Sequence, residues 1–404
     1  MSPYAVRYDP AAAPETGSVE EYKLLEVSAE LAKAIEQASK DGDQHVRLTM
    51  KGTPADDAVI CTPTQTFTLR TITVSNSMLF LRPDETTQDL YIQDTCHEIL
   101  ELTPSVPRLA RVEKLLRETS WEGIRGTKRT RDEFGESGER TKGRKRYTRA
   151  QLQSVIQSSD AELDAGFRAR NVIEVNGHLI LLPTKHLFPL LSTALQLLTI
   201  HSLDPLSHAA QRRPTTNTRR APAGPIVEHL ETEYSVEPDI TRAVMRLCGD
   251  LQDSTDEVWT ADLERIVKEV GKGLLSLESA HEPPTRDGFL KKWREQVGEE
   301  YEHVLDLSLL EGEYLLRDPL NSTFTKQPHL IPFSVSSLPT DPAQRFTDLF
   351  LTRAQWRPED MQPFLKGLTP EGDRKAMDKL VVKYVRVVKE SGKAGNRVWW
   401  HARR

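Results

Sequence analysis

The chain has 404 residues, of which 37% are hydrophobic and 28% charged, and its formal net charge is −6 at pH 7. This length predicts roughly two to four domains. The three cysteines, Cys61, Cys96 and Cys248, are odd in number and far apart, which excludes a disulfide framework and favours a reducing compartment. The most apolar stretch, residues 188–203, is interrupted by polar residues and predicts a core helix rather than a membrane span.

The first domain is predicted to consist mainly of strands. Residues 1–19 are expected to form a flexible tail, and residues 20–121 a domain with a closing helix over 107–120. Strands are predicted around 46–50, 58–61, 66–70, 78–81 and 91–102, with one helix over 28–39 that Ser28 caps. Such a set is small for independent stability, so we expect an antiparallel β-barrel-like domain that partner chains complete. A small barrel that closes on itself is the alternative.

A basic segment follows the first domain. Residues 125–149 contain ten Lys or Arg, four Asp or Glu and four glycines, which predicts a disordered linker over residues 122–147. Its run Gly143-Arg144-Lys145-Arg146 is consistent with a nuclear localisation signal or with a loose phosphate contact.

Residues 148–206 are predicted to form a first winged helix. Thr148 begins one helix and Ser159 or Asp160 a second. Asn176-Gly177 then separates two apolar strands, which is the strongest short signal for a hairpin with a type I′ turn. The hairpin carries little charge, so we expect it to serve in packing or to contact protein rather than DNA. A helix over 187–198 follows.

Two further winged helices are predicted. Residues 207–225 are expected to be a linker, and residues 226–284 a winged helix with one helix over 241–248. Thr260 is predicted to cap another helix over 261–270, which Gly271 and Gly273 would end before a strand over 274–277. Residues 285–404 are the third winged helix, with a helix starting at Thr285 or Asp287 and a Pro-rich loop over 319–342.

The C-terminal end carries the strongest functional signal. A helix is predicted over 374–390, with apolar residues on one face and Lys375, Lys379, Lys383 and Arg386 on the other, followed by a strand over 398–400. Residues 372–404 carry a net charge of +7 on an acidic protein, which favours nucleic-acid binding; a merely solvated basic face is the alternative. The predicted DNA-binding residues are Lys375, Lys379, Lys383, Arg386, Lys389, Lys393, Arg397 and Arg403.

Catalytic and cofactor motifs are missing from the sequence. It has no phosphate-binding loop, dinucleotide-binding glycine motif, His-Glu-x-x-His, Cys-x-x-Cys or Gly-x-Ser-x-Gly. We therefore expect a protein without enzymatic activity, metal or cofactor.

Several runs resemble the "defective in sister chromatid cohesion" family. They are Val74-Ser75-Asn76-Ser77-Met78-Leu79, Gln93-Asp94-Thr95-Cys96-His97-Glu98, and, in the C-terminal part, Arg345-Phe346, Leu349-Phe350, Trp356 and Lys383-Tyr384. The resemblance covers nearly the whole chain in order, and only the charged insert over 125–149 departs from it.

The resemblance implies a nuclear accessory subunit of an alternative, RFC-like clamp loader, which handles the PCNA sliding clamp during DNA replication and the cell cycle. It implies a barrel shared with the small subunit and the large ATPase subunit of that loader. It further implies tandem winged helices that bind the catalytic subunit of DNA polymerase epsilon and single- or double-stranded DNA. A free-standing winged-helix transcription regulator is the alternative function.

Overall fold

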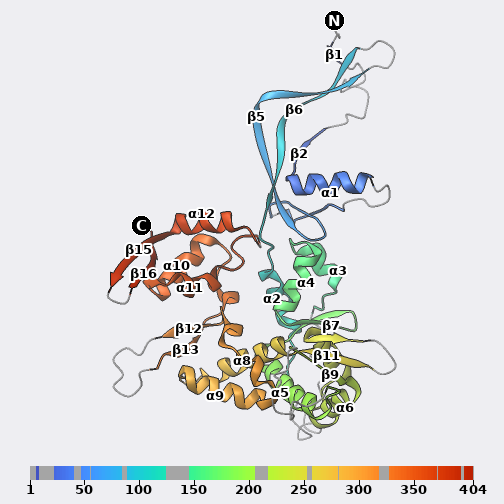
Figure 1. The fold of residues 1–404 in the computed structure, drawn as a ribbon. Coiled ribbons are helices and arrows are strands. Elements are labelled where there is room, and N and C mark those ends of the chain that lie inside the picture. The colour runs from blue at the N-terminus through green and yellow to red at the C-terminus, as the bar shows by residue number, and fades with distance from the viewer. Residues whose placement is uncertain are drawn as a thin grey trace. The chain divides into compact units, whose positions relative to one another are not determined.

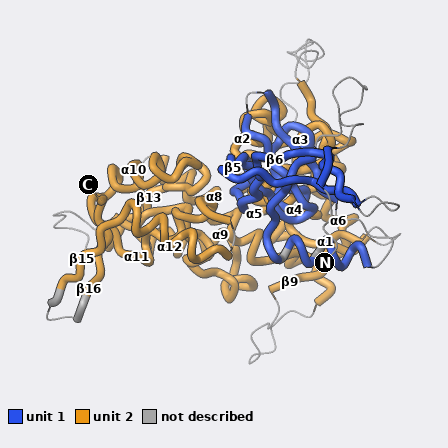
Figure 2. The backbone as a smooth tube through the Cα atoms, turned by 90° about the horizontal axis from the view of Figure 1, so that it is seen from above, with its two compact units in different colours: residues 1–108, 153–163 blue, residues 109–152, 164–404 orange. Residues whose placement is uncertain are grey.

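The structure is a computed structural model that describes residues 6–8, 22–40, 47–54, 56–83, 89–123, 145–204, 217–252, 257–280, 282–317, 327–370, 372–392 and 395–403. The chain is mixed α+β (Figure 1). It divides into two compact units, one of residues 1–108 and 153–163 and the other of residues 109–152 and 164–404 (Figure 2). Residues 153–163 thus group with the strands, and not with the rest of the segment predicted to begin at residue 148.

The first unit is built on one open, six-stranded sheet. Its elements are β1 (Val6–Tyr8), β2 (Leu24–Glu26), α1 (Ala29–Lys40), β3 (Thr49–Lys51), β4 (Val59–Cys61), β5 (Thr66–Pro83) and β6 (Leu90–Pro104). The strand order is β1-β6-β5-β4-β3, and β2 also pairs with β6. Within the described residues the sheet does not close into a barrel.

Three expectations for this unit are corrected. β1 and β2 run parallel to β6, so the sheet is not wholly antiparallel. β1 lies inside the predicted tail. The runs over 66–70 and 78–81 belong to one long strand, β5, which pairs with β6 across register shifts between Thr73 and Met78 and between Phe80 and Leu81. Alternation within each run was visible in the sequence, but the irregular pairing that joins them was not.

The core of the sheet is small. Leu31 of α1 packs with Ile60, Phe67 and Leu102 of the strands, and few other residues join them. The predicted cap of α1 is confirmed, because the Ser28 hydroxyl accepts a hydrogen bond from the Leu31 amide at 3.3 Å.

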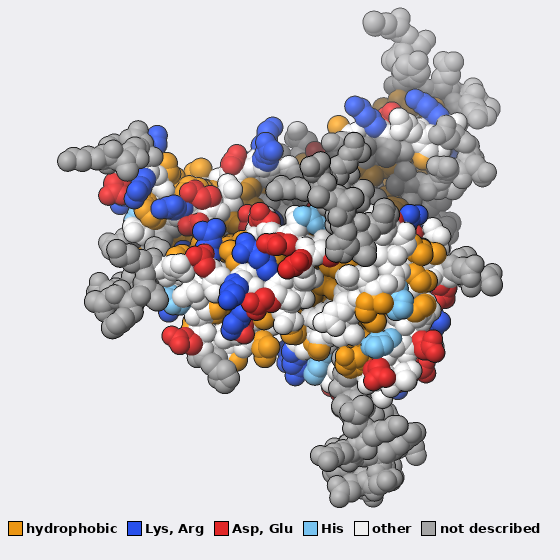
Figure 3. All heavy atoms as spheres, turned by 60° about the horizontal axis from the view of Figure 1, so that its bottom comes forward, with side chains coloured by type: hydrophobic (Ala, Val, Ile, Leu, Met, Phe, Trp, Pro, Cys, Tyr) orange, Lys and Arg blue, Asp and Glu red, His pale blue; other side chains and the backbone are white. Residues whose placement is uncertain are grey.

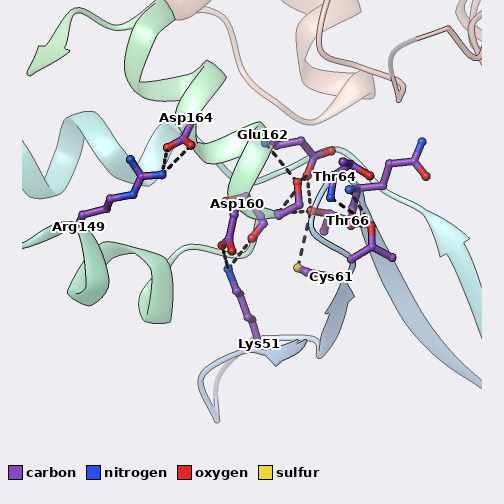
Figure 4. A network of polar contacts seen from close by, with 12 residues as sticks. Lys51, Cys61, Thr64, Thr66, Arg149, Asp160, Glu162 and Asp164 are labelled. Carbon is purple, nitrogen blue, oxygen red and sulfur yellow. Dashed lines mark hydrogen bonds and ion pairs between the residues drawn. The ribbon is translucent and has the colours of Figure 1, made fainter. Parts of the chain in front are cut away.

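A polar network holds residues 158–162 against strands β3 to β5 (Figure 4). The Thr66 hydroxyl donates to the Glu162 carboxylate at 2.5 Å and accepts from the Ser159 amide at 2.8 Å. Lys51 donates to the Ser158 carbonyl at 2.7 Å. Thr66 and Ser159 are buried, so each of these polar groups depends on the others for a partner.

The next elements along the chain are the closing helix predicted for the first domain and the elements predicted for the first winged helix, of which residues 153–163 belong to the first unit. These are α2 (Ala110–Leu116), the 3₁₀ turn η2 (Arg117–Thr119), α3 (Arg149–Val155), α4 (Asp160–Ala169), β7 (Val172–Val175), β8 (His178–Leu181) and α5 (Thr184–Ile200). The Asn-Gly hairpin is confirmed: β7 pairs with β8, and Asn176 and Gly177 have φ angles of 50° and 74°. The predicted basic linker lies mostly outside the described residues.

A three-stranded sheet and four helices follow. The elements are β9 (Thr218–Pro222), α6 (Ala223–Tyr234), α7 (Pro238–Leu247), β10 (Gly249–Leu251), β11 (Val258–Asp262), α8 (Leu263–Glu278) and α9 (Arg286–Val297), with the sheet order β10-β11-β9. β9 lies inside the segment predicted to be a linker. The cap of α9 is confirmed, since the Thr285 hydroxyl accepts from the Gly288 amide at 3.3 Å.

The predicted bounds of α8 were wrong. Thr260 lies in β11, and Asp262 caps the helix by accepting from the Arg265 amide at 3.2 Å. The helix continues through Gly271 and Gly273, so residues 274–277 are helical. A Cβ at Gly273 would lie 2.3 Å from Phe188 Cβ, and one at Gly271 would lie 2.6 Å from the Trp293 ring. These glycines permit close packing and do not end the helix.

The C-terminal part of the chain combines helices with a long hairpin. The elements are η3 (Glu299–Val304), η4 (Leu307–Leu310), β12 (Tyr314–Arg317), β13 (His329–Pro332), η5 (Val335–Ser337), α10 (Pro342–Thr352), β14 (Gln355–Trp356), α11 (Pro358–Met361), η6 (Gln362–Leu365), α12 (Arg374–Tyr384), β15 (Val385–Gly392) and β16 (Gly395–Ala402). The last sheet has the order β14-β16-β15. None of the described helices is both long and apolar enough for a membrane span.

The predicted helix over 374–390 was also wrong in its second half. α12 ends at Tyr384, and β15 pairs with β16 over its whole length (Figure 1). Val385, Val387 and Val388 are β-branched and favour a strand, and β16 supplies the partner that an isolated helix would not have. The apolar spacing of a helix and that of a strand coincide over this short run.

Candidate nucleic-acid interface

A compact core supports the C-terminal basic element. Phe346, Leu349, Trp356, Phe364 and Trp400 are all buried in it. The Phe346 ring stacks on Tyr384 of α12 with ring centroids 5.0 Å apart. The core therefore fixes α12 through its apolar side, as the sequence predicted.

Arg345 lies inside this core, which the sequence did not predict. Its side chain is buried, and its guanidinium donates to the carbonyl oxygens of Pro339 at 2.6 Å, Lys366 at 2.7 Å and Phe364 at 3.3 Å. Burial lowers the pKa of the guanidinium from its ordinary value. Arg345 thus links the segment before α10 to the turn after η6. Backbone carbonyl oxygens are the hydrogen-bond partners of its buried positive charge.

The lysines predicted on α12 lie on its solvent-facing side. Asp373 caps the helix by accepting from the Ala376 amide at 2.9 Å. Lys375, Lys379 and Lys383 are exposed, and among the described residues none of the three forms an ion pair. We call these three side chains the α12 ridge. Met377, Leu380, Val381 and Tyr384 pack against the core on the other side.

The hairpin separates the remaining predicted residues onto two faces. Val385 and Trp400 are buried, and each lies on the face that packs on the core. Lys389, four residues after Val385 in β15, shares that face. Arg386 and Arg397 point to the opposite face, and both are exposed. Lys393 lies outside the described residues.

Arg403 differs from the other predicted residues because it has a structural role. Its amide donates to the Tyr384 carbonyl at 2.9 Å, and its guanidinium donates to the Val382 carbonyl. These bonds satisfy carbonyls at the end of α12, which lie beyond the last intrahelical hydrogen bond. The side chain remains exposed beside the α12 ridge.

Sequence reasoning missed a cluster on the outer face of the hairpin. The Trp399 indole donates to the Glu390 carboxylate at 3.0 Å, and the Arg357 guanidinium lies 5.7 Å from the Trp399 ring centroid. Arg357 precedes α11 and is distant in sequence, so no spacing rule connects it with Trp399. The alternation within β16 placed Trp399 and Trp400 on opposite faces and was the available signal.

The first unit presents a second surface that is open to solvent. Only Thr66 and Phe67 of the long strand β5 are buried, whereas Ile72, Leu79 and Leu81 are 40%, 47% and 42% exposed. A two-stranded ribbon of this kind can bury little apolar surface against its own residues. Exposed apolar side chains along such a ribbon mark a contact surface.

Neither surface has the groups of a reactive centre. Among the described residues, no three His, Cys, Asp or Glu side chains are grouped as a metal site. All three cysteines are buried, and burial raises the pKa of the Cys248 thiol to about 12, which suppresses the nucleophilic thiolate. The described residues present two surfaces, an apolar strand surface on the first unit and a cationic surface at the C-terminal end.

The comparisons with known proteins place the chain in a family. The family model for sister chromatid cohesion protein Dcc1 matches residues 22–365, and the chain belongs to that family. It is 26% identical to the probable sister chromatid cohesion protein DCC1 of Dictyostelium discoideum, with 92% of each chain covered. The mouse protein of that name is 27% identical, covering 90% of this chain and 84% of its own, and the Saccharomyces cerevisiae protein is 25% identical, covering 95% of both.

The family match has a defined extent. It includes the open sheet apart from β1 and ends at Leu365, before every residue of the predicted DNA-binding set. The pairwise matches with the relatives cover more of the chain than the family model does. The assignment of the cationic surface depends on this chain's own residues and their geometry.

Proposed function

We propose that this protein is a non-catalytic subunit that acts in sister chromatid cohesion in the nucleus, as part of an RFC-like clamp loader that handles PCNA. In this proposal the open sheet binds the large and small subunits of the loader. The C-terminal part binds DNA, and the winged helices also contact DNA polymerase epsilon. Membership of the Dcc1 family supports the role in cohesion. The exposed apolar ribbon of β5 supports assembly with other chains.

The C-terminal elements are consistent with a winged helix. A helix, a short strand, two helices and a hairpin follow one another as α10, β14, α11, α12, β15 and β16, and the first strand pairs with the last. In winged helices and other helix-turn-helix variants the last helix enters the groove of DNA. Here that helix is α12, the one that carries three exposed lysines.

The observation that carries the DNA-binding proposal is the α12 ridge. Lys375, Lys379 and Lys383 recur every four residues, so they form one row along the helix. Each is exposed, and the apolar side of the helix alone attaches it to the core. Lysines are point charges that contact phosphates without reading bases, so binding is expected to be independent of sequence.

The test is a charge reversal on the ridge in the full chain. We expect K379E/K383E to weaken binding to a labelled duplex and to lower the slope of log affinity against log salt by about 1.8, because each lost phosphate contact removes about 0.9. Fluorescence anisotropy at several salt concentrations measures both quantities.

A matched control separates local contacts from net charge. K185E/K291E makes the same change of charge at exposed lysines of α5 and α9. The control should leave the salt slope unchanged. Equal slopes for the wild type and K379E/K383E would refute the ridge as the DNA-binding surface.

A further inference from the structure

The segment that follows η2 lies beside the β7–β8 hairpin and fixes the position of one tryptophan. Ser120 pairs with Leu181 of β8 as an isolated parallel bridge, and the Trp121 amide donates to the Leu181 carbonyl at 2.9 Å. Gly123 then turns the chain with a φ of 94°, a conformation that favours glycine. A Cβ on Gly123 would press on the His186 ring, so the close approach also requires glycine.

The Trp121 side chain lines two hollows in the second unit. One is a cavity of about 420 Å³, lined mainly by residues 118–123, the β7–β8 hairpin and the turn from α6 to α7. We call it the Trp121 cavity. The other hollow includes His186, whose ring contacts Trp121 edge-on with centroids 6.2 Å apart. The Trp121 cavity has the size of ordinary ligand pockets, which are about 300–1,000 Å³.

The indole N–H of Trp121 is a donor without a partner among the described residues. The indoles of Trp259, Trp293 and Trp356 all donate to backbone carbonyl oxygens. Tryptophan usually satisfies its N–H in this way when it is buried. Trp121 is only partly buried, so the carbonyl oxygen of a bound chain can serve as its acceptor.

Carboxylates outnumber cations around the Trp121 cavity. Glu118, Glu122 and Glu237 line it, against one guanidinium, that of Arg146. Glu118 and Glu237 are exposed, and neither forms an ion pair with a described residue. Over the face of the molecule that Figure 3 shows, in contrast, acidic and basic side chains are interspersed. A local excess of carboxylates attracts cations and repels phosphates.

The acidic character continues beyond the cavity. Glu231 and Glu233, in the last turn of α6, are exposed and precede the lining residues Ser235 to Glu237. Within the described part of the chain, neither has an ion-pair partner. A small free amine would use the cavity alone, whereas a chain with several basic residues would use both the cavity and this turn.

We propose that the Trp121 cavity binds a lysine or arginine side chain from a basic segment of another protein. The cationic group lies against the Trp121 ring, whose face attracts positive charge. Glu118 and Glu237 balance its charge, and a main-chain carbonyl of the segment accepts from the indole N–H. The same carboxylates repel DNA, so this surface has a different ligand from the α12 ridge. The proposal depends on neither DNA binding nor clamp-loader assembly.

The test is binding of a basic peptide to the full chain. The probe is a fluorescein-labelled peptide of alternating lysine and glycine, and fluorescence anisotropy at about 0.15 M salt limits the attraction of distant charges. E118Q/E237Q should weaken binding about three- to tenfold, because it removes two charges and keeps the size of both side chains. W121A should weaken binding about 5- to 30-fold, the range for one cation–π contact. W121F, which keeps an aromatic ring, should weaken it less.

A matched control separates the cavity from net charge. E295Q/E359Q removes the same charge at exposed glutamates of α9 and α11, which form no ion pair with any described residue. It should leave peptide affinity within about twofold of the wild type. Trp121 packs partly against the core, so W121A can also change stability. E118Q/E237Q changes only exposed side chains and should melt within about 1 °C of the wild type.

Three outcomes would overturn the proposal. Peptide affinity of E118Q/E237Q equal to that of E295Q/E359Q would show that the cavity carboxylates are not the contacts. Spermine that displaces the peptide at equal concentration would reassign the cavity to small polyamines.

The third outcome concerns the chain's own residues 124–144. They carry seven Lys or Arg and four Asp or Glu, and they connect Gly123 with the stretch that contains Arg146. Replacing them by a Gly-Ser linker of equal length should leave peptide affinity within about threefold. A gain of about tenfold or more would show that this segment, and not another protein, occupies the cavity.

Discussion

Gly273 of α8 is a position where one added methyl group should disturb the packing of two helices in the second unit. A Cβ there would lie 2.3 Å from Phe188 Cβ and 2.7 Å from its Cγ. The nearest atom belongs to the rigid start of the side chain on α5, so it cannot rotate away. G273A therefore requires the two helices to separate.

The expected cost follows from two opposing effects. Overfilling a packed site typically costs about 1–3 kcal/mol. Replacing glycine by alanine inside a helix gains back about 1 kcal/mol, since alanine has the higher helix propensity. A contact near 2.3 Å lies about 1 Å inside van der Waals distance, so the cost should fall at the upper end, giving a net loss of about 2 kcal/mol. For a unit of more than 200 residues this lowers the melting temperature by about 4–8 °C.

Gly224 provides the matched control, because a Cβ on this residue of α6 would meet no atom within 4 Å. G224A should leave the melting temperature unchanged or raise it slightly. Differential scanning calorimetry of the full chain measures both variants, and G271A, whose Cβ would press on the Trp293 ring at 2.6 Å, should behave like G273A. A melting temperature for G273A at or above that of G224A would refute the packing argument.

Two further predictions concern the cationic core and the open sheet. R345M should lower the free energy of unfolding of the C-terminal part by about 3 kcal/mol, because it leaves buried carbonyls without their charged donor; a urea curve unchanged from that of the wild type would contradict this. L79E/L81E should leave the melting temperature within about 1 °C, since both side chains are already partly in water. If the proposed assembly with clamp-loader subunits holds, it should nevertheless abolish co-purification with those subunits, whereas L351E, at an 80% exposed position outside the sheet, should not.

Local sequence signals predicted the local structure well. Ser28 and Thr285 cap the helices that they were expected to cap, and Asn176-Gly177 turns the expected hairpin. Each of these depends on a few neighbouring residues whose chemistry is visible in the sequence. The strands were expected to form a β-barrel-like domain that partner chains complete, because they cannot bury enough apolar surface alone. Within the described residues they form an open sheet, and its completion by other chains stays a prediction.

The wrong predictions involve contacts with residues outside the element itself. Gly271 and Gly273 resemble helix ends, and only the positions of Trp293 and Phe188 show that they are close contacts. The second half of the predicted C-terminal helix is a strand because β16 pairs with it.

The candidate site was predicted in part for the same reason. Helical spacing identified Lys375, Lys379 and Lys383 correctly as one exposed row. It grouped Arg386 with them, although the hairpin register places Arg386 on another face. The contact of Arg357 with the Trp399 ring was not predicted, nor were the hydrogen bonds of Arg345 to buried carbonyl oxygens. Both depend on tertiary structure.

The polar network around Thr66 has a consequence for biosynthesis. The strands are complete once residue 104 has been made, but the Thr66 hydroxyl then has only the Cys61 thiol beside it, and its strong partners and those of the Lys51 ammonium lie in residues 158–162. On a ribosome adding about 5–20 residues per second, the nascent sheet waits several seconds with these groups in water. A truncated gene that ends near residue 121 would leave Thr66 and Lys51 permanently without these partners. A fragment designed to express the sheet should therefore extend to residue 163.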